Sequence, residues 1–273
     1  MAAINQTNEL IQQADSSFIF KLFQPEGRLS AYVQGVWSAS VSPEDPGSIK
    51  RWLQGDACSG ILFNLKGPIY LDKIQYSAKV LLLSVSKQAH SITLPAGSQL
   101  AGIRFQPGIS FGIFKTHCDK PIALKEGALS LELQAIVNRL VNTPDHYARI
   151  SALYRWANRI TNFSDMIPTS LSHALNIVQK TQALGPLNGD VPVSQRQLER
   201  QFQKWMDMTP KQYQRILRVK RALNFLKQTP DADLVALALD NGFSDQAHMT
   251  REFKQIAKIT PKKYSKLVVC RQN

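Results

Sequence analysis

The chain has 273 residues, of which 44% are apolar, and a formal net charge of +13 at pH 7. This length allows two domains, since a domain commonly takes about 100 to 200 residues. No stretch approaches the roughly 18 to 20 apolar residues of a membrane span, and the N-terminus lacks a basic region followed by an apolar one, so we expect a cytoplasmic protein with no membrane partner.

Short β-strands are predicted over the first 106 residues. Runs rich in β-branched and aromatic residues alternate with turn formers such as Pro95-Ala-Gly97. The expected strands cover residues 17–23, 32–37, 60–65, 80–85, 91–94 and 99–105. Regularly spaced short strands favour a sandwich or a small barrel.

Helical periodicity begins at about residue 127. Two apolar stripes have helical spacing, namely Leu133, Ile136, Val137, Leu140 and Val141, and then Ile150, Leu153, Tyr154 and Ala157. Both stripes can pack on the β-structure, or one of them can form a homodimer interface. We therefore expect residues 1–160 to form a β-rich domain that ends in two helices.

Charge is unevenly divided along the chain. Residues 1–160 hold 16 Lys and Arg against 11 Asp and Glu, a net +5, whereas residues 161–273 hold 17 against 9, a net +8. Residues 161–169 are the expected linker, and 170–273 the second domain, which is helical. A basic domain favours polyanionic partners through counterion release.

The last 80 residues contain one helical unit twice. The block Ser-Gln-Arg-Gln-Leu-Glu-Arg-Gln-Phe at 194–202 recurs 51 positions later as Asp-Gln-Ala-His-Met-Thr-Arg-Glu-Phe at 245–253. Each copy runs on to Thr-Pro-Lys, at 209–211 and 260–262, and then to a tyrosine, Tyr213 or Tyr264. Each reads as a polar cap, an amphipathic helix and a Thr-Pro stop, so the duplication predicts two copies of one function.

The second copy has the pattern of a helix-turn-helix. Leu234, Leu237 and Ala238 give a first helix its inward face, and Gly242 supplies a turn residue that tolerates positive φ. Ser244 or Asp245 is expected to cap the next helix. The inward residues of that helix are Met249, Phe253 and Ile256, and those of the first copy are Leu198, Phe202 and Trp205.

The outward side chains of both copies suit base recognition in the DNA major groove. Arg can donate to guanine O6 and N7, Gln can pair with adenine, and Glu can accept from cytosine. The expected base-reading residues are Gln195, Arg196, Gln197, Glu199 and Arg200, together with Gln246, His248, Thr250 and Arg251. The expected phosphate contacts are Lys204, Lys211, Lys254, Lys262 and Lys263. The alternative is a helical bundle with a solvated charged surface, but duplication at matching register favours DNA.

An uninterrupted helix is predicted between the copies, from Pro210 to Lys227. About 17 residues at roughly 1.5 Å each give a rod of about 25 Å. Successive major grooves lie about 34 Å apart. The rod is therefore of the right order to hold two recognition helices.

The segment from about Leu171 to Leu267 resembles the DNA-binding domain of AraC/XylS-type bacterial transcription regulators. The resemblance lies in the two repeated blocks, in Arg218-Val-Lys-Arg-Ala222, and above all in the run from Asn241 to Tyr264. It implies an all-α domain of two helix-turn-helix subdomains joined by a linker helix, with recognition helices at about 194–206 and 245–257 in successive major grooves. The implied function is sequence-specific transcription regulation on double-stranded promoter DNA, with RNA polymerase as a further candidate partner and no enzyme activity.

The first copy departs from the family pattern before its recognition helix. The stretch 183–193 contains Gly185, Pro186, Gly189 and Pro192, which oppose a regular helix. We therefore expect a short or irregular supporting helix there.

The N-terminal half resembles the cupin-like effector or dimerisation domains of the same family, through its strand spacing and the run Gly102-Ile-Arg-Phe-Gln-Pro-Gly108. The expected fold is therefore α+β, with a β-barrel or cupin-like first domain. Such a domain implies a small-molecule effector or a homodimer. The candidate pocket residues are Trp37, Trp52, Tyr70 and Arg104, with Arg104 facing an anionic ligand; the alternative is that they are ordinary core and surface residues.

Two alternatives to a transcription regulator without enzyme activity involve a chemical reaction. A cupin-type metalloenzyme needs His and Glu ligands on its strands, but residues 60–105 offer His90 alone as a histidine. An alkylation-repair regulator needs a methyl-accepting cysteine with an activating neighbour, and Cys58 has none nearby in sequence. Cys58, Cys118, Cys270 and the five histidines also lack metal-ligand spacing, so we expect no metal, cofactor or catalytic residue.

Overall fold

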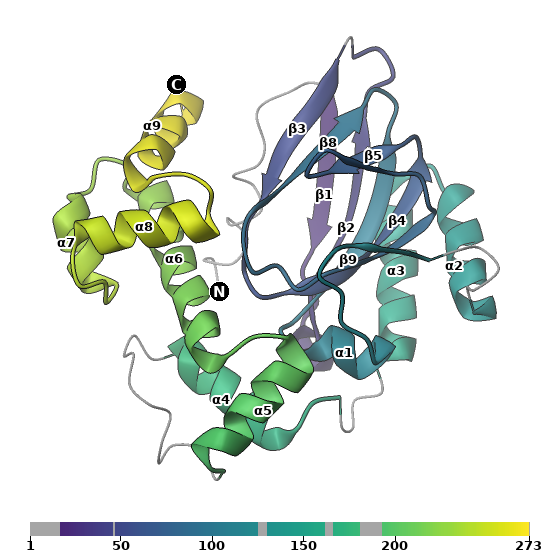
Figure 1. Ribbon diagram of the computed structural model, residues 1–273. Coiled ribbons are helices and arrows are strands. Elements are labelled where there is room, and N and C mark those ends of the chain that lie inside the picture. Colours follow the sequence, from purple (N-terminus) through teal and green to yellow (C-terminus); the bar gives the residue numbers. More distant parts are fainter. Residues whose placement is uncertain (1–16, 46, 125–129, 162–165, 181–192, 273) are drawn as a thin grey trace. The chain divides into compact units, whose positions relative to one another are not determined.

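The computed structural model describes residues 17–45, 47–124, 130–161, 166–180 and 193–272, and it divides into two compact units (Figure 1). The elements of the first unit are β1 (Phe18–Phe23), the 3-10 helix η2 (Gly27–Ala31), β2 (Val33–Val41), β3 (Ser48–Leu53), β4 (Ser59–Lys66), β5 (Ile69–Leu71), β6 (Ile74–Tyr76), β7 (Val80–Leu83), β8 (His90–Pro95), β9 (Gln99–Phe105), α1 (Ile109–Phe114), β10 (Ile122–Leu124), α2 (Leu131–Val141) and α3 (His146–Ile160). Those of the second are α4 (Thr169–Lys180), α5 (Gln195–Met206), α6 (Pro210–Gln228), α7 (Leu234–Asp240), α8 (Gln246–Ile256) and α9 (Pro261–Gln272).

The strands of the first unit form two antiparallel sheets. One has six strands in the order β1-β2-β9-β4-β7-β10, and the other has four in the order β3-β8-β5-β6. Among the described strands these sheets are open, and no closed barrel forms. Of the two folds that the strand spacing favours, this arrangement is the sandwich and not the small barrel. The two sheets lie face to face, and their common core removes apolar side chains from water on both inner faces.

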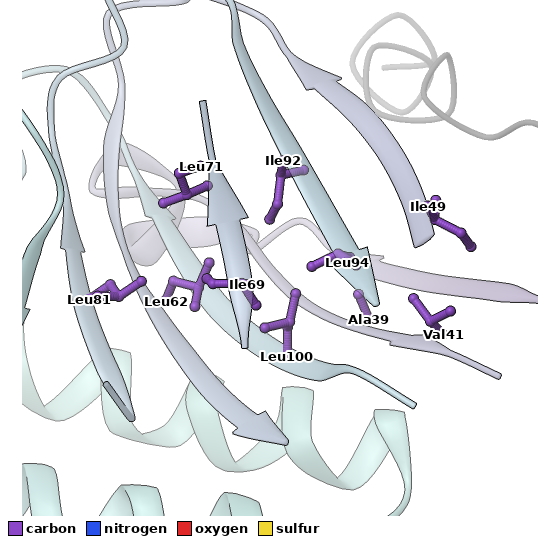
Figure 2. Packing of buried hydrophobic residues seen from close by; sticks show 10 residues of the cluster. All are labelled: Ala39, Val41, Ile49, Leu62, Ile69, Leu71, Leu81, Ile92, Leu94 and Leu100. Atoms are coloured by element: carbon purple, nitrogen blue, oxygen red, sulfur yellow. The ribbon is translucent and has the colours of Figure 1, made fainter. Parts of the chain in front are cut away.

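That core lies between the sheets (Figure 2). The six-stranded sheet contributes Ala39, Val41, Leu62, Leu81 and Leu100, and the four-stranded sheet contributes Ile49, Ile69, Leu71, Ile92 and Leu94. All ten side chains are at most 7% exposed. Because side chains alternate along a strand, the residues between them face the opposite side of each sheet.

The opposite face of the six-stranded sheet is covered by α2 and α3. Helix α3 packs against β1, β2 and β9, and α2 packs against β4. Trp156 of α3 is 2% exposed and meets the ring of Phe63 edge-on at 5.8 Å. Within the described residues, most of each apolar stripe is thus buried, as the first of the two interpretations of these helices expects, whereas Val141 at the end of α2 is 45% exposed.

A polar contact joins the start of α3 to strand β2. The ring nitrogens of His146 lie 2.8 Å from the Ser38 hydroxyl and 3.1 Å from the Ser40 hydroxyl. Arg149, one turn further along, is buried and donates to the Gln99 side chain at 2.6 Å. Burial, with the nearby positive charge of Arg149, lowers the pKa of His146.

This lowered pKa predicts that the first unit loses stability on mild acidification. The unfolded chain takes up a proton on His146 near its ordinary pKa of 6.5, while the folded chain binds it only at lower pH. The stabilising contribution is therefore present above that value and is lost as the pH falls towards the folded pKa. We expect the stability advantage of the natural chain over His146→Asn to shrink between about pH 7.5 and about pH 5.5. Urea unfolding of both chains at each pH measures the difference between their free energies of unfolding. A difference that does not change with pH contradicts the prediction.

Six predicted strands are confirmed as β1, β2, β4, β7, β8 and β9, and the two predicted helices as α2 and α3. Strands β3, β5, β6 and β10 were not predicted. In β3 the inward positions hold Ile49 and Arg51, both buried, and a buried arginine obscures the alternation that marks a strand. The other three have only three residues each.

Within the described residues, the regular elements of the second unit are all helices, and two short non-helical segments, Gln54–Ala57 and Ser86–Ala89, also belong to this unit. Helix α6, which was predicted from Pro210 to Lys227 and extends to Gln228, contacts α5, α8 and α9 (Figure 1). Helix α4 packs on α5, and α7 packs on α8. None of the helices within the described residues is long and apolar enough to cross a bilayer. Of the expected linker, 161–169, residues 162–165 lie outside the described residues.

Candidate nucleic-acid interface

Helices α7 and α8 form a complete helix-turn-helix. Asp233 caps α7 by accepting from the Val235 amide at 2.9 Å. Gly242 has φ of 74°, as the sequence predicted, and allows the chain to turn. Asp245 then caps α8 by accepting from the His248 amide at 2.6 Å, and this bond holds the pKa of Asp245 below its usual range.

The apolar face of α8 is used as predicted. Met249, Phe253 and Ile256 are buried, and Leu237 and Ala238 of α7 are buried with them. The three-residue and four-residue spacing also puts Glu252 on the inward side, where its side chain is only 7% exposed. A carboxylate at an inward position needs a buried partner, and this spacing was a signal that the sequence reasoning missed.

Helix α5 repeats this design in the first copy. Ser194 caps it in a reciprocal capping box, in which the Gln197 amide donates to the serine hydroxyl and the Gln197 side chain accepts from the Ser194 amide at 3.0 Å. Leu198 and Phe202 are buried as predicted, whereas Trp205 is half-buried and Met206 takes the fully buried position. The irregular entry expected over residues 183–193 falls almost entirely outside the described residues.

Both copies end with the same backbone change. Asp207 and Lys258, which are 51 positions apart, adopt left-handed conformations with φ of 50° and 58°. The threonine that follows each of them starts the next helix: Thr209 accepts from the Gln212 amide at 3.2 Å, and Thr260 from the Lys263 amide at 3.2 Å. The Thr-Pro pairs therefore serve as helix starts as well as stops.

Helix α6 is tied to both copies. Tyr213, near its start, packs its ring 5.9 Å from Phe202 and its hydroxyl accepts from the Gln179 side chain at 3.0 Å. Further along, Arg218 donates to the Gly242 carbonyl at 2.9 Å and lies 5.1 Å from the ring of Phe243. Burial lowers the pKa of Arg218. The linker helix thus holds the turn of the second copy directly.

The predicted base-reading residues differ in their exposure and in their contacts. Gln195, Arg196, Glu199 and Arg200 of α5 and Gln246 and Arg251 of α8 are exposed, and Thr250 is half-buried. The Gln195 side chain donates to Glu199 at 2.9 Å.

Gln197 and His248 occupy the same position in the two repeats, the third residue of each helix, and both side chains cap the helix start. His248 is half-buried, and its Nδ1 accepts from the Ser244 amide at 3.2 Å. The Ser-x-x-Gln spacing could have revealed this role for Gln197. The predicted phosphate contacts Lys204, Lys211, Lys254, Lys262 and Lys263 are all exposed.

The four candidate pocket residues of the first unit are not brought together. Trp37 and Arg104 lie on the inner face of the six-stranded sheet, in register with Gly102 and Gly60, and the Trp37 ring covers Gly102. On the four-stranded sheet, Trp52 pairs with Ser91 and Tyr70 with Thr93, so both share the face opposite Ile49 and Ile92. Trp52 is 45% exposed there. One cavity lined by all four is therefore not formed.

Comparison with known proteins divides the chain in the same way. Residues 189–267 match a family model described as a helix-turn-helix domain. Residues 21–120 match a domain of unknown function, DUF6597.

Two regulators of Pseudomonas aeruginosa are similar to part of the chain. The HTH-type transcriptional regulator ArgR is 36% identical over 72 residues, which make up 26% of this chain and 22% of that protein. The HTH-type transcriptional regulator GbdR is 32% identical over 130 residues, 42% of this chain and 35% of that protein. The matched parts thus span about a fifth of the first relative and about a third of the second.

Among solved structures, ToxT from Vibrio cholerae aligns with 92% of this chain and 98% of its own, at 11% identity and a TM-score of 0.43. The geometry of α7 and α8 agrees with the helix-turn-helix family match over residues 189–267. Residues 189–267 thus form a helix-turn-helix domain of the kind found in AraC-type transcription regulators.

Proposed function

We propose that the chain regulates transcription by binding a specific promoter sequence, with α5 and α8 inserted in successive major grooves. The observation that carries the proposal is the match between the exposed faces of the two helices. Arg200 and Arg251 occupy one repeat position and Gln195 and Gln246 another, and all four side chains are exposed. These are residue types that pair with base edges in the major groove.

The length of α6 supports simultaneous insertion. Its 19 residues give an axis of about 28 Å at roughly 1.5 Å per residue. Successive major grooves on one face of DNA are about 34 Å apart. Since α6 contacts both recognition helices, it can hold them at a separation of this order.

For the first unit we propose a sensing or dimerisation role within residues 1–160, followed by a linker at 161–169 and the DNA-binding domain from 170. Its facing antiparallel sheets support a cupin-like arrangement. Of the four pocket candidates, Trp37 and Arg104 share one face of the six-stranded sheet, so these two are the candidates for contact with a small-molecule effector.

The enzymatic alternatives have less support. The matched family consists of regulators and not of enzymes. Cys58, the candidate methyl acceptor, is 2% exposed, and its burial opposes transfer of a methyl group from DNA.

Selection of bound fragments from random DNA with the full chain tests the proposal. We expect enrichment of one sequence with two separated clusters of preferred bases, about one helical turn apart. If enriched fragments bind no more tightly than the starting pool, sequence-specific regulation by this chain is ruled out.

Removal of single lysines is expected to reduce the salt dependence of DNA binding. The logarithm of the binding constant falls with the logarithm of salt concentration by about 0.9 per neutralised phosphate. Lys262→Ala should therefore make this slope shallower by about 0.9 and weaken binding to every sequence alike. Titrations at several salt concentrations measure the slope, with Lys66→Ala, an exposed lysine of β4, as control. An unchanged slope for Lys262→Ala contradicts its assignment as a phosphate contact.

A further inference from the structure

Helix α8 is attached to α6 by a charged contact in a mostly buried position. Arg215 of α6 donates through Nε to Glu252 Oε1 at 2.7 Å and through its terminal nitrogen to the Gln255 side chain. The Glu252 side chain is 7% exposed and that of Arg215 is 28% exposed. A charge-assisted contact with fork geometry fixes orientation as well as distance.

The same carboxylate is also linked, through the His248 side chain, to the turn that precedes α8. His248 Nε2 lies 3.3 Å from Glu252 Oε1, while His248 Nδ1 accepts from the Ser244 amide. Since Nδ1 accepts, Nε2 carries the hydrogen and donates to Glu252. Glu252 therefore connects three parts of the domain: the linker helix, the recognition helix and its N-terminal turn.

The contact between Arg215 and Glu252 lies close to the residues proposed to face DNA, so it can affect their positions. Glu252 follows the exposed Arg251 directly, and Gln246 is at the first position of the helix. The 11 residues of α8 extend over about 16 Å, so a tilt of about 10° moves one end by about 3 Å. Hydrogen bonds to base edges tolerate far less than this displacement.

In the first copy, different residues make the contact that holds the recognition helix to its neighbour. Gln201 is the repeat equivalent of Glu252, and its side chain accepts from the Ser170 hydroxyl of α4 at 2.9 Å. Helix α5 thus has at this position a neutral contact to α4, whereas α8 has a charged contact to α6. The charged contact is specific to the second recognition helix.

We infer that Arg215 and Glu252 are positioning residues, which set the orientation of α8 on α6 and thereby determine how strongly the second recognition helix discriminates between DNA sequences. Neither residue needs to touch DNA for this role. The inference rests on the proposed function, because it concerns the quality of recognition by α8.

The test compares full-length Arg215→Met, Glu252→Met and the double variant with the natural chain. Each binds the DNA selected by the natural chain and a scrambled duplex over a range of salt concentrations. We expect the ratio of the two affinities to fall about tenfold, which is the discrimination that one well-placed side chain provides at one base pair. The salt slope should stay unchanged, and the double variant should be no worse than either single one, because both remove one contact.

Lys211→Met provides the matched contrast on the same helix. Lys211 is an exposed cation near the start of α6. Its replacement should weaken binding to both duplexes equally and make the salt slope shallower. If Arg215→Met behaves like Lys211→Met, Arg215 is a phosphate contact and the inference is overturned.

Folding is checked by thermal unfolding of each variant. Glu252→Met keeps a side chain of similar length but has no oxygen to accept from Arg215, so it decides the matter if Arg215→Met does not fold. A folded Glu252→Met chain with an unaltered affinity ratio overturns the inference alone. A natural chain that binds both duplexes equally overturns the proposed function as well.

Discussion

Replacing Arg251 by alanine is expected to lower the affinity of the chain for its target by about ten- to a hundredfold, corresponding to about 1 to 3 kcal/mol for a forked contact to guanine. Arg251 is exposed on α8, beside the buried Glu252 that joins the helix to α6. Its guanidinium can therefore point at base edges from a fixed helix. Affinities of the variant should be measured for the selected DNA and for duplexes with each base pair changed in turn.

The pattern over these duplexes distinguishes base recognition from charge attraction. Arg251→Ala should lose the preference at one position and retain it at the others. Arg251→Lys keeps the charge but not the fork, so it should lose the same preference with little change in salt slope. Lys254→Ala, on the same helix, should weaken binding to all duplexes alike. A uniform loss for Arg251→Ala would show that this arginine contacts phosphate.

Phe253→Ala is expected to reduce the free energy of unfolding of the DNA-binding domain by about 3 to 5 kcal/mol, as is usual for a buried phenylalanine. The Phe253 side chain is fully buried in α8. A loss of this size approaches the whole stability of a small domain. When the Phe253→Ala variant is heated, we therefore expect it to lose specific DNA binding at the same temperature at which it loses its native helical signal.

Phe225 of α6 provides a matched control, because it is the same residue type in the same domain and is 47% exposed. Phe225→Ala should cost less than about 1 kcal/mol. Urea unfolding followed by far-UV circular dichroism measures both changes. Similar losses for the two variants would contradict the placement of Phe253 in the core.

The second helix-turn-helix could be predicted from sequence in nearly every detail, because its signals are local. Gly242 at the turn, Asp245 at the cap and the spacing of Met249, Phe253 and Ile256 each depend on neighbours within one or two helical turns. Such patterns are written in consecutive residues, and the structure contains them as expected.

Contacts between distant residues could not be predicted in this way. The buried guanidinium of Arg51 lies 5.0 Å from the ring of Phe18, and nothing near Arg51 in sequence indicates that partner. Likewise Arg215 and Glu252 are 37 positions apart. Strand register decides that Trp52 and Tyr70 lie on the outer face of their sheet, and the sequence alone does not determine that register.

Differences between the two recognition faces have a consequence for the regulated DNA. Arg196 and Glu199 of α5 correspond in the repeat to Ala247 and Thr250 of α8, so the two helices present different chemistry to the bases. If both read DNA as proposed, the sequence bound by one chain is not a palindrome. The bound DNA sequence then has a direction. When a promoter carries this sequence inverted, the opposite end of the bound protein faces the proteins that assemble downstream.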